Sequence, residues 1–230
     1  MSIRRHPSPS CDLTAEEIAR WRAVPPAVAV DLGAPIRQPD PAIRPLSPPG
    51  RQPRLFGRAV TALCSPPDFG AVLAALDLVG PGEVLVIATS GHAETAMLGE
   101  ILGAQLRRQG AAGVACDGAV RDVGTLAGWD DLPVFTRHVT PRGPTSARLG
   151  AVNAPVSLGG ALVRPGDLLL GDDDGLAVIP PSAVRGMIAA AEAKLRLEAA
   201  WEARLASGTP VAEVFELPPT EAAAADGDPA

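Results

Sequence analysis

Short apolar runs, separated by glycine and proline, predict strands through the middle of the chain. The runs at residues 81–90 and 111–118 have the continuous apolar character of buried strands. Residues 146–180 contain further short runs with tight turns between them, which predict several short strands. The clearest single runs lie at residues 55–64, 81–90, 111–118 and 132–139.

A second group of segments has apolar residues at helical spacing. Residues 68–79 predict a short amphipathic helix. Residues 91–110 predict a longer one, which stops at Gly110 after two arginines, a common signal for a helix C-terminus. Residues 181–208 predict a long helix capped by Ser182.

The N-terminal region is rich in proline. Of the 25 prolines in the chain, 13 lie at or before Pro67. Residues 13–24 predict one helix, because Thr14 and Glu17 have the spacing of a capping box. The following residues, 25–54, cannot form a long helix or a central strand. We expect them to lie along the surface or to reach a neighbouring subunit.

Helices and strands do not alternate strictly, so the pattern favours a sheet-rich α/β sandwich over a doubly wound fold. We expect three segments. Residues 1–56 form a proline-rich arm with one helix, residues 57–208 form the folded domain with the long C-terminal helix, and residues 209–230 form a low-complexity tail.

Composition narrows the class of protein. Hydrophobic residues make up 47% of the chain, aromatic residues only 3%, and Tyr is absent, so Ala, Val and Leu must fill the core. The net charge of −6 argues against a nucleic-acid partner, because such proteins usually carry a basic face. No apolar run approaches the roughly 20 residues that span a bilayer, and no signal peptide is evident, so no membrane association is expected.

The cysteines and the lysine restrict the chemistry further. Cys11, Cys64 and Cys116 are too widely spaced for a disulfide framework or a zinc motif, which predicts reduced cysteines in a cytoplasmic protein. Lys194 is the single lysine, and Glu192 and Glu198 lie within helical reach of it, which would keep it charged. A Schiff-base enzyme needs a neutral lysine amine. Any carbonyl chemistry is therefore expected to use a metal ion or hydrogen bonds.

Residues 116–122, CDGAVRD, follow a predicted buried strand and place two charges side by side. We expect a turn at Asp117-Gly118. Neighbouring strand residues point to opposite faces, so Arg121 and Asp122 can serve one pocket only from irregular backbone.

These charges and the preceding GE sequence suggest a site for a small α-keto acid. Arg121 offers a planar fork for a carboxylate or an enolate oxygen. Asp122 and Glu100 are hard oxygen ligands of the kind that Mg²⁺ or Mn²⁺ prefers. Gly99, at a helix start, leaves backbone N–H groups free to bind a carboxylate. The alternative is an Arg–Asp pair that pins a loop, with Glu100 on a solvated helix face.

Other polar motifs are weaker. The sequence GDDDG at residues 171–175 lacks the spacing of a calcium loop and predicts a tight turn between strands. Ser90 and His92 are not set in a nucleophile elbow. His138 is predicted to be a strand residue.

Two longer stretches, GEILGAQLRRQGAAGVACDGAVRDVGTL at residues 99–126 and RPGDLLLGDDDGLAVIP at residues 164–180, resemble the paired signatures of the RraA-like family. FGRAVTAL at residues 56–63 is similar to that family's first core strand. The family includes the class II 4-hydroxy-4-methyl-2-oxoglutarate/4-carboxy-4-hydroxy-2-oxoadipate aldolases. The resemblance, from about Leu13 to Gly208, implies a three-layer β/β/α swivelling-domain sandwich that assembles as trimers or hexamers with the active site between subunits.

The resemblance also implies a divalent metal site. Asp122 matches the residue that binds Mg²⁺ or Mn²⁺ directly. Glu100 matches an acidic residue that reaches the metal through water. Glu198 aligns with a glutamate that approaches the metal from a neighbouring subunit.

For the substrate, the resemblance implies a pyruvyl-binding pocket. Arg121 matches the residue that contacts the pyruvyl group and stabilises its enolate. Gly99 and the backbone amides of Ile101 and Leu102 match the segment that holds the carboxylate. The implied reaction is metal-dependent cleavage of 4-hydroxy-2-oxo acids to pyruvate, with oxaloacetate decarboxylation through the same enolate.

One alternative from the same family is a non-catalytic regulator that binds a ribonuclease or another protein. Relatives of that kind tend to lose the acidic residue that Glu100 supplies here. An older family label, demethylmenaquinone methyltransferase, would require a glycine-rich S-adenosylmethionine loop that the sequence does not contain. The chain departs from the aldolase pattern at His92, where a small polar residue is expected, and in the C-terminal residues 209–219.

Overall fold

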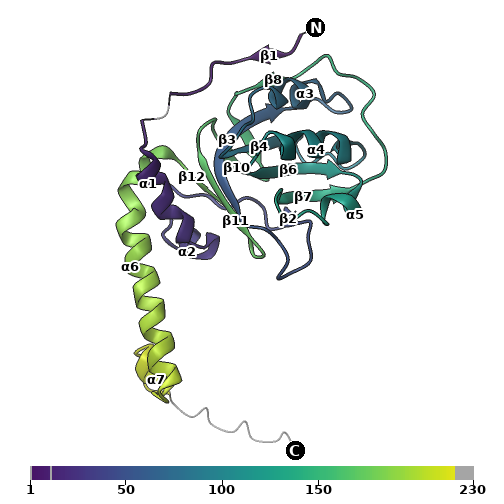
Figure 1. Cartoon of the computed structure of the whole chain (residues 1–230). Helices are drawn as coiled ribbons and strands as arrows, with labels where there is room; N and C mark the ends of the chain where they lie inside the picture. The colour runs from purple at the N-terminus through teal and green to yellow at the C-terminus, as the bar shows by residue number, and fades with distance from the viewer. Residues whose placement is uncertain (1, 11, 221–230) are drawn as a thin grey trace, which may run out of the picture. The chain divides into compact units, whose positions relative to one another are not determined.

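The computed structural model describes residues 2–10 and 12–220 (Figure 1). The chain divides into two compact units, residues 1–191 and residues 192–230. Cys11 and residues 221–230 of the predicted low-complexity tail lie outside the described residues.

Four parallel strands form the centre of the first unit, in the order β3–β4–β6–β7. Strand β3 also pairs antiparallel with β11, and β11 pairs with β12. The bounds of these strands are Leu55–Leu63 for β3, Glu83–Ala88 for β4, Gly113–Val120 for β6, Val134–Val139 for β7, Leu168–Asp172 for β11 and Gly175–Ile179 for β12.

Short strands extend this sheet at its edges, and two more form a separate hairpin. The hairpin of β9 and β10 is antiparallel. The bounds of these strands are Arg4–Arg5 for β1, Arg44–Pro45 for β2, Ala96–Leu98 for β5, Ala151–Val152 for β8, Val156–Leu158 for β9 and Ala161–Val163 for β10.

The central sheet is covered on both faces. Helices α3 (Gly70–Leu76), α4 (Glu100–Arg108) and α5 (Val123–Leu126) contribute to one apolar cluster, and the β9–β10 hairpin contributes to another. This arrangement is the β/β/α layering that the family resemblance implies. The predicted fold class is therefore confirmed. Because parallel strands are buried on both sides, their sequences read as nearly continuous apolar runs.

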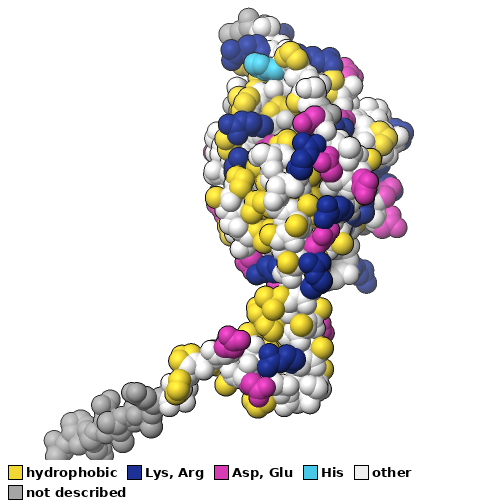
Figure 2. All heavy atoms as spheres, turned by 90° about the vertical axis from the view of Figure 1, so that its left-hand side faces the viewer, with side chains coloured by type: hydrophobic (Ala, Val, Ile, Leu, Met, Phe, Trp, Pro, Cys, Tyr) yellow, Lys and Arg dark blue, Asp and Glu magenta, His cyan; other side chains and the backbone are white. Residues whose placement is uncertain are grey.

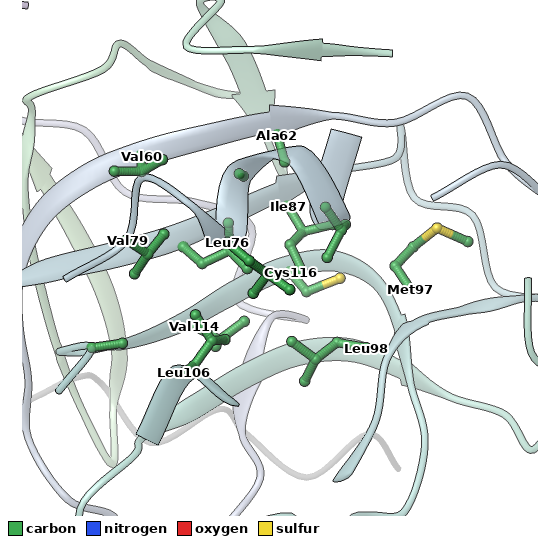
Figure 3. Packing of buried hydrophobic residues seen from close by; sticks show 14 of the residues in the cluster. Val60, Ala62, Leu76, Val79, Ile87, Met97, Leu98, Leu106, Val114 and Cys116 are labelled. Carbon is green, nitrogen blue, oxygen red and sulfur yellow. The ribbon is translucent and has the colours of Figure 1, made fainter. Parts of the chain in front are cut away.

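Strand β4 shows how the two layers are built from alternate residues. Leu85 and Ile87 pack in the cluster beneath the helices, part of which Figure 3 shows. Val84 and Val86 belong to the cluster on the hairpin side. All four side chains are fully buried, as expected for a strand with no solvent face.

The long strand predictions are confirmed, but one helix prediction is partly wrong. Within residues 91–110, the first half forms a loop and strand β5, and α4 begins only at Glu100. The apolar side chains of Ala96, Met97 and Leu98 are all buried, which a three-residue strand achieves by pairing with β6. Helical spacing cannot be distinguished from a short buried strand by periodicity alone.

Two local predictions also need correction. Asp117 and Gly118 do not form a turn, because β6 continues through them to Val120 with a register irregularity against β7. Ser182 lies inside α6, which begins at Pro181, so it does not cap that helix. Proline at the first position is favourable because it has no N–H to satisfy.

The N-terminal region contributes to the core of the first unit. Helix α1 (Ala15–Arg20) has the predicted capping box, and its last residue leads into the short 3₁₀ helix η1 (Trp21–Ala23). Trp21 is fully buried and donates from Nε1 to the carbonyl oxygen of Val184 at 2.8 Å. A second short helix, α2 (Pro26–Asp31), follows.

The second unit consists of helical segments within the described residues. It holds the end of α6 (Pro181–Ala206) and α7 (Val211–Val214), joined by packing of Trp201 against Phe215, whose ring centres are 5.1 Å apart. Apolar side chains lie on its surface (Figure 2). No helix within the described residues is long and apolar enough to cross a membrane.

Asp68 fastens the start of α3 to a distant loop. Its side chain is only 2% exposed and accepts hydrogen bonds from the backbone N–H groups of Gly70, Arg148 and Leu149 at 2.8–3.0 Å. Burial alone would raise the pKa of Asp68, but these bonds and one from Ser146 outweigh it and lower the pKa to about 2. The ionised carboxylate therefore holds the loop in place.

We expect Asp68→Ala to destabilise the fold by about 3 kcal/mol, because one buried and two partly buried N–H groups lose their acceptor. Chemical denaturation measures the loss. The native pKa of about 2 lies below the ordinary value of 3.8, so the wild-type carboxylate contributes stability above pH 4 and loses it as the pH falls towards 2. The variant should lose less stability over that range. Exposed Asp77→Ala is the control, and an equal effect there would contradict this role.

Candidate functional site

A cavity of about 320 Å³ opens beside the N-terminus of α4, at the carboxyl end of β6. Ligands commonly bind at this edge of parallel α/β sheets. Its lining joins the segments after β5 and β6 to α3 and to a loop near residue 143. The lining residues are Phe69, Leu73, Ala96, Met97, Leu98, Gly99, Ile101, Leu102, Arg121, Asp122, Gly143 and Pro144.

The backbone after β6 brings two neighbouring charged side chains into this cavity. The Arg121 N–H donates to the Leu98 carbonyl oxygen at 3.0 Å, which continues the pairing with β5. Asp122 then adopts a left-handed conformation with φ 56° and ψ 37°. This conformation is unusual for a residue other than glycine and turns the chain sharply. The expectation of irregular backbone at this position is confirmed.

Two glycines allow other backbone segments to approach these side chains closely. A Cβ at Gly99 would lie 2.5 Å from Asp122 Oδ2 and 2.9 Å from Arg121 Cγ. A Cβ at Gly143 would lie 2.7 Å from Arg121 Nη1. The Arg121 side chain is thus enclosed between two backbone segments, which restricts its rotamers and orients its guanidinium.

The N-terminus of α4 presents backbone donors to the cavity. Gly99 caps the helix without a side-chain hydrogen bond. Asp122 Oδ2 accepts from the N–H of Glu100 at 3.0 Å. Ile101 and Leu102 occupy the next two positions, where N–H groups have no partner within a helix. These groups and the positive end of the helix dipole favour a bound carboxylate.

The described lining of the cavity carries one positive and one negative side chain. Arg121 and Asp122 are the charged side chains in its lining, as far as the chain is described. Arg121 Nε lies 3.6 Å from Asp122 Oδ2, and the two side chains are 41% and 40% exposed. The rest of the wall is largely apolar. A ligand that carries one carboxylate and a compact apolar part would match it.

The structure brings most of the predicted site residues together. Gly99, Ile101, Leu102, Arg121 and Asp122 line the cavity. The side chain of Glu100 does not: it is exposed, and its Oε2 lies 3.5 Å from the hydroxyl of Thr125.

Glu198 belongs to the second unit. There its carboxylate pairs with Lys194 at 3.7 Å. Its assignment to a neighbouring subunit's metal site stays a prediction. The pairing also agrees with the expectation that Lys194 is charged.

The sequence analysis did not predict the residues that form the largely apolar wall of this cavity. Phe69 is the N-cap of α3 and Leu73 lies within that helix, while Gly143 and Pro144 come from the loop that Asp68 fastens. No motif marks these residues, because an apolar residue at a cavity wall looks the same in sequence as one in the core. The PRGP sequence at residues 141–144, with two prolines and a glycine, is a local signal that could have marked an ordered turn here.

The predicted Mg²⁺ or Mn²⁺ site can be checked against the side-chain donor atoms that the structure brings together. No three His, Cys, Asp or Glu side chains gather in a metal-binding arrangement within residues 2–10 and 12–220. Asp122 keeps Oδ1 available, because its one hydrogen bond uses Oδ2. Mg²⁺ commonly binds one or two carboxylates and completes its shell with water and substrate oxygens. The donor set of a single chain therefore fits Mg²⁺ or Mn²⁺ without forming a closed site.

Comparisons with known proteins identify the family. The RraA-like model, described as Aldolase/RraA, matches residues 28–178, about two thirds of the chain. The chain belongs to the RraA-like family. A protein of Halalkalibacterium halodurans, provisionally named a 4-hydroxy-4-methyl-2-oxoglutarate aldolase, is 31% identical over 177 residues, which cover 77% of this chain and 82% of that protein.

Solved structures agree with this assignment. An uncharacterised protein of Pseudomonas syringae pv. tomato has a TM-score of 0.78 at 24% identity, covering 92% of this chain and 98% of its own. At that identity it supports the fold alone. Streptomyces coelicolor RraAS2, titled an unusual member of the RNase ES inhibitor RraA family, has a TM-score of 0.72 at 29% identity and covers 83% and 98% of the two chains. RraA-like relatives therefore carry both aldolase and inhibitor names.

Gly99→Ala should weaken binding of pyruvate at least about tenfold, because the added Cβ displaces the Asp122 carboxylate and the Arg121 side chain. Isothermal titration measures the affinity. Gly124→Ala is a matched control, since nothing lies within 4 Å of its Cβ. Wild-type affinity in Gly99→Ala would contradict the close approach.

Proposed function

We propose that the protein is a divalent-metal-dependent lyase that cleaves 4-hydroxy-2-oxo acids to pyruvate through an enolate. Decarboxylation of oxaloacetate is a second reaction of the same site, since it passes through the same enolate. The observation that carries the proposal is the cavity in which Arg121 and Asp122 lie beside the open N-terminus of α4. The provisional aldolase name of the H. halodurans relative supports it.

The chain's own groups would bind and orient the substrate. The N–H groups of Ile101 and Leu102 hold the carboxylate at the helix N-terminus. Arg121 donates to the 2-keto oxygen, where negative charge develops as the C3–C4 bond breaks. A donor that is already oriented before the reaction stabilises that charge with little reorganisation. Close contacts with Gly99 and Gly143 give Arg121 this orientation.

Asp122 would hold Mg²⁺ or Mn²⁺ directly through Oδ1, and Glu100 through water, with Glu198 of a neighbouring subunit as a further acidic group. The bound ion supplies Lewis-acid polarisation of the substrate oxygens. Glu100 is exposed and lies in the chain between the lining residues Gly99 and Ile101, so its carboxylate would accept the proton of the 4-hydroxyl group through a water molecule. Phe69 and Leu73 exclude other water from the enolate.

A second candidate function is a non-catalytic regulator that binds a ribonuclease or another protein. The similarity to RraAS2, with its inhibitor title, is the observation that favours it. Such a role needs neither the Arg121 geometry nor a metal ion. Glu100, which the chain retains, favours the enzyme.

Release of pyruvate from a panel of 4-hydroxy-2-oxo acids and oxaloacetate, followed with lactate dehydrogenase, distinguishes the two. We expect turnover with Mg²⁺ or Mn²⁺, loss of turnover with EDTA, and none in Asp122→Ala even at saturating metal. Absence of pyruvate from every substrate, with folded protein and added metal, would favour the regulator.

Arg121→Lys should lower kcat/KM by about 10²–10³, although the charge is kept, because lysine cannot donate two parallel hydrogen bonds and does not fill the space between the glycines. Arg108→Lys is the control: this exposed arginine of α4 contacts Gln105 and should tolerate the change. A loss below about threefold in Arg121→Lys would count against the assigned role.

We further propose a trimer or hexamer whose active site is completed by Glu198 of a neighbouring subunit. Asp122→Ala and Glu198→Ala should each be inactive alone and regain activity when mixed, since some interfaces then carry both wild-type residues. Light scattering gives the oligomeric state, and Glu202→Ala, on the same helix, should stay active. A fully active monomer would contradict this proposal. So would failure of the Asp122→Ala and Glu198→Ala variants to complement each other after verified subunit exchange.

A further inference from the structure

A second cavity, of about 340 Å³, lies at the other face of the central sheet. The first cavity contacts the helix-side cluster, whereas the second is walled partly by the β9–β10 hairpin. The two share no lining residue among those described. The second is lined only by polar residues and glycine: Asp40, Ser90, Gly91, Asp117, Arg137, Ser157, Gly159 and Gly160.

Asp117 supplies a carboxylate oxygen that faces this cavity. The residue is only 3% exposed. Its Oδ1 accepts from the N–H and the hydroxyl of Thr89, at 2.6 and 3.0 Å. Within the described chain, Oδ2 has neither a hydrogen bond nor a cation within 4.0 Å. Oδ2 is not one of the buried polar atoms without a partner in the described chain, so the cavity gives water or a ligand access to it.

The other buried carboxylates of the described chain have partners that Asp117 Oδ2 lacks. Asp68 uses both oxygens to accept backbone hydrogen bonds. Asp167 has Arg37 at 3.5 Å as its cation. Asp117 is buried to the same degree but faces a cavity. The cavity is therefore where its missing partner would lie.

Arg137 offers the complementary group in the same wall. It follows Thr136, which pairs with Cys116 across β6 and β7, so Arg137 and Asp117 lie next to each other on neighbouring strands. No ion pair joins them in the described structure. Arg137 Nη2 is bound to Asp40, while Nη1 has no acceptor among the described residues. One carboxylate oxygen of Asp117 and two guanidinium nitrogens of Arg137, Nη1 and the buried Nε, thus remain without a partner within the described chain.

The remaining wall is suited to a small polar ligand. Gly91, Gly159 and Gly160 all have positive φ, at 77°, 52° and 82°, so side chains are disfavoured there and the backbone forms the wall. Ser90 and Ser157 add hydroxyl groups that both donate and accept hydrogen bonds. A large apolar ligand would find no apolar side chain in this described lining.

We propose that this cavity binds a small zwitterion, an α-amino acid with a short polar side chain. The ammonium group donates to Asp117 Oδ2, and the carboxylate accepts from Arg137 Nη1. A simple anion is disfavoured because Asp40 and Asp117 outnumber Arg137. A simple amine would leave the Arg137 donor unused.

Isothermal titration of the full chain with L-serine and glycine tests this, with ethanolamine and glycolate as probes that each lack one charged group. We expect L-serine to bind at concentrations up to about 10 mM and both single-charge probes to bind at least about tenfold more weakly. Arg137→Gln should weaken L-serine binding at least about tenfold. Arg108→Gln, which removes an arginine outside both cavities, should not.

Asp117→Asn should have the same effect as Arg137→Gln, but Asp117 also anchors Thr89, so the more exposed Arg137 is the decisive position. Arg121→Gln should leave L-serine affinity unchanged. If it abolishes binding, L-serine occupies the first cavity and the proposal is wrong. It is also wrong if no zwitterion binds, or if ethanolamine or glycolate binds as tightly as L-serine. None of these outcomes depends on the lyase activity.

Discussion

Burial of the central parallel sheet on both faces is the constraint on which the rest of this protein depends. Strands β3, β4, β6 and β7 are buried on both faces over most of their length, so charged side chains reach a cavity or solvent mainly near the strand ends. At the carboxyl end of β6, the chain turns through the left-handed residue Asp122 and delivers two charges to one cavity. The position of the candidate site therefore follows from the place where β6 leaves the buried core.

Asp122 has two tasks that compete for its oxygens. Oδ2 accepts the first free N–H of α4 and thereby joins the two halves of the pocket. Oδ1 is left for a ligand. The two interpretations of the Arg–Asp pair from sequence, a pin for a loop and a functional site, are therefore compatible. The carboxylate that pins the helix also sets the position of Arg121, because Gly99 packs against both side chains.

The sheet also separates two cavities of different chemistry. Strand β6 contributes Asp117 to the cavity on the hairpin side, while the residues just after the strand line the helix side. The helix-side cavity has a largely apolar wall, which suits exclusion of water from a reactive enolate. The other has only polar and glycine lining, which suits recognition of a small charged molecule. One strand end can therefore serve both without the sites sharing a residue.

The sequence by itself determined the long strands and the capping box at Thr14 and Glu17, because these depend on local spacing and local backbone preference. The residues of the RraA-like signature came instead from the resemblance of two stretches to that family. It also indicated irregular backbone at Arg121 and Asp122, since two adjacent charges after a buried strand are difficult to place otherwise. It did not distinguish strand β5 from the start of α4, because three buried residues satisfy either period. Only the tertiary structure decided that Phe69 and Gly143 meet Arg121, and that Asp117 keeps an oxygen without a partner. Those contacts join residues that are far apart in the chain, and their energies depend on which segments pack together, which no local pattern records.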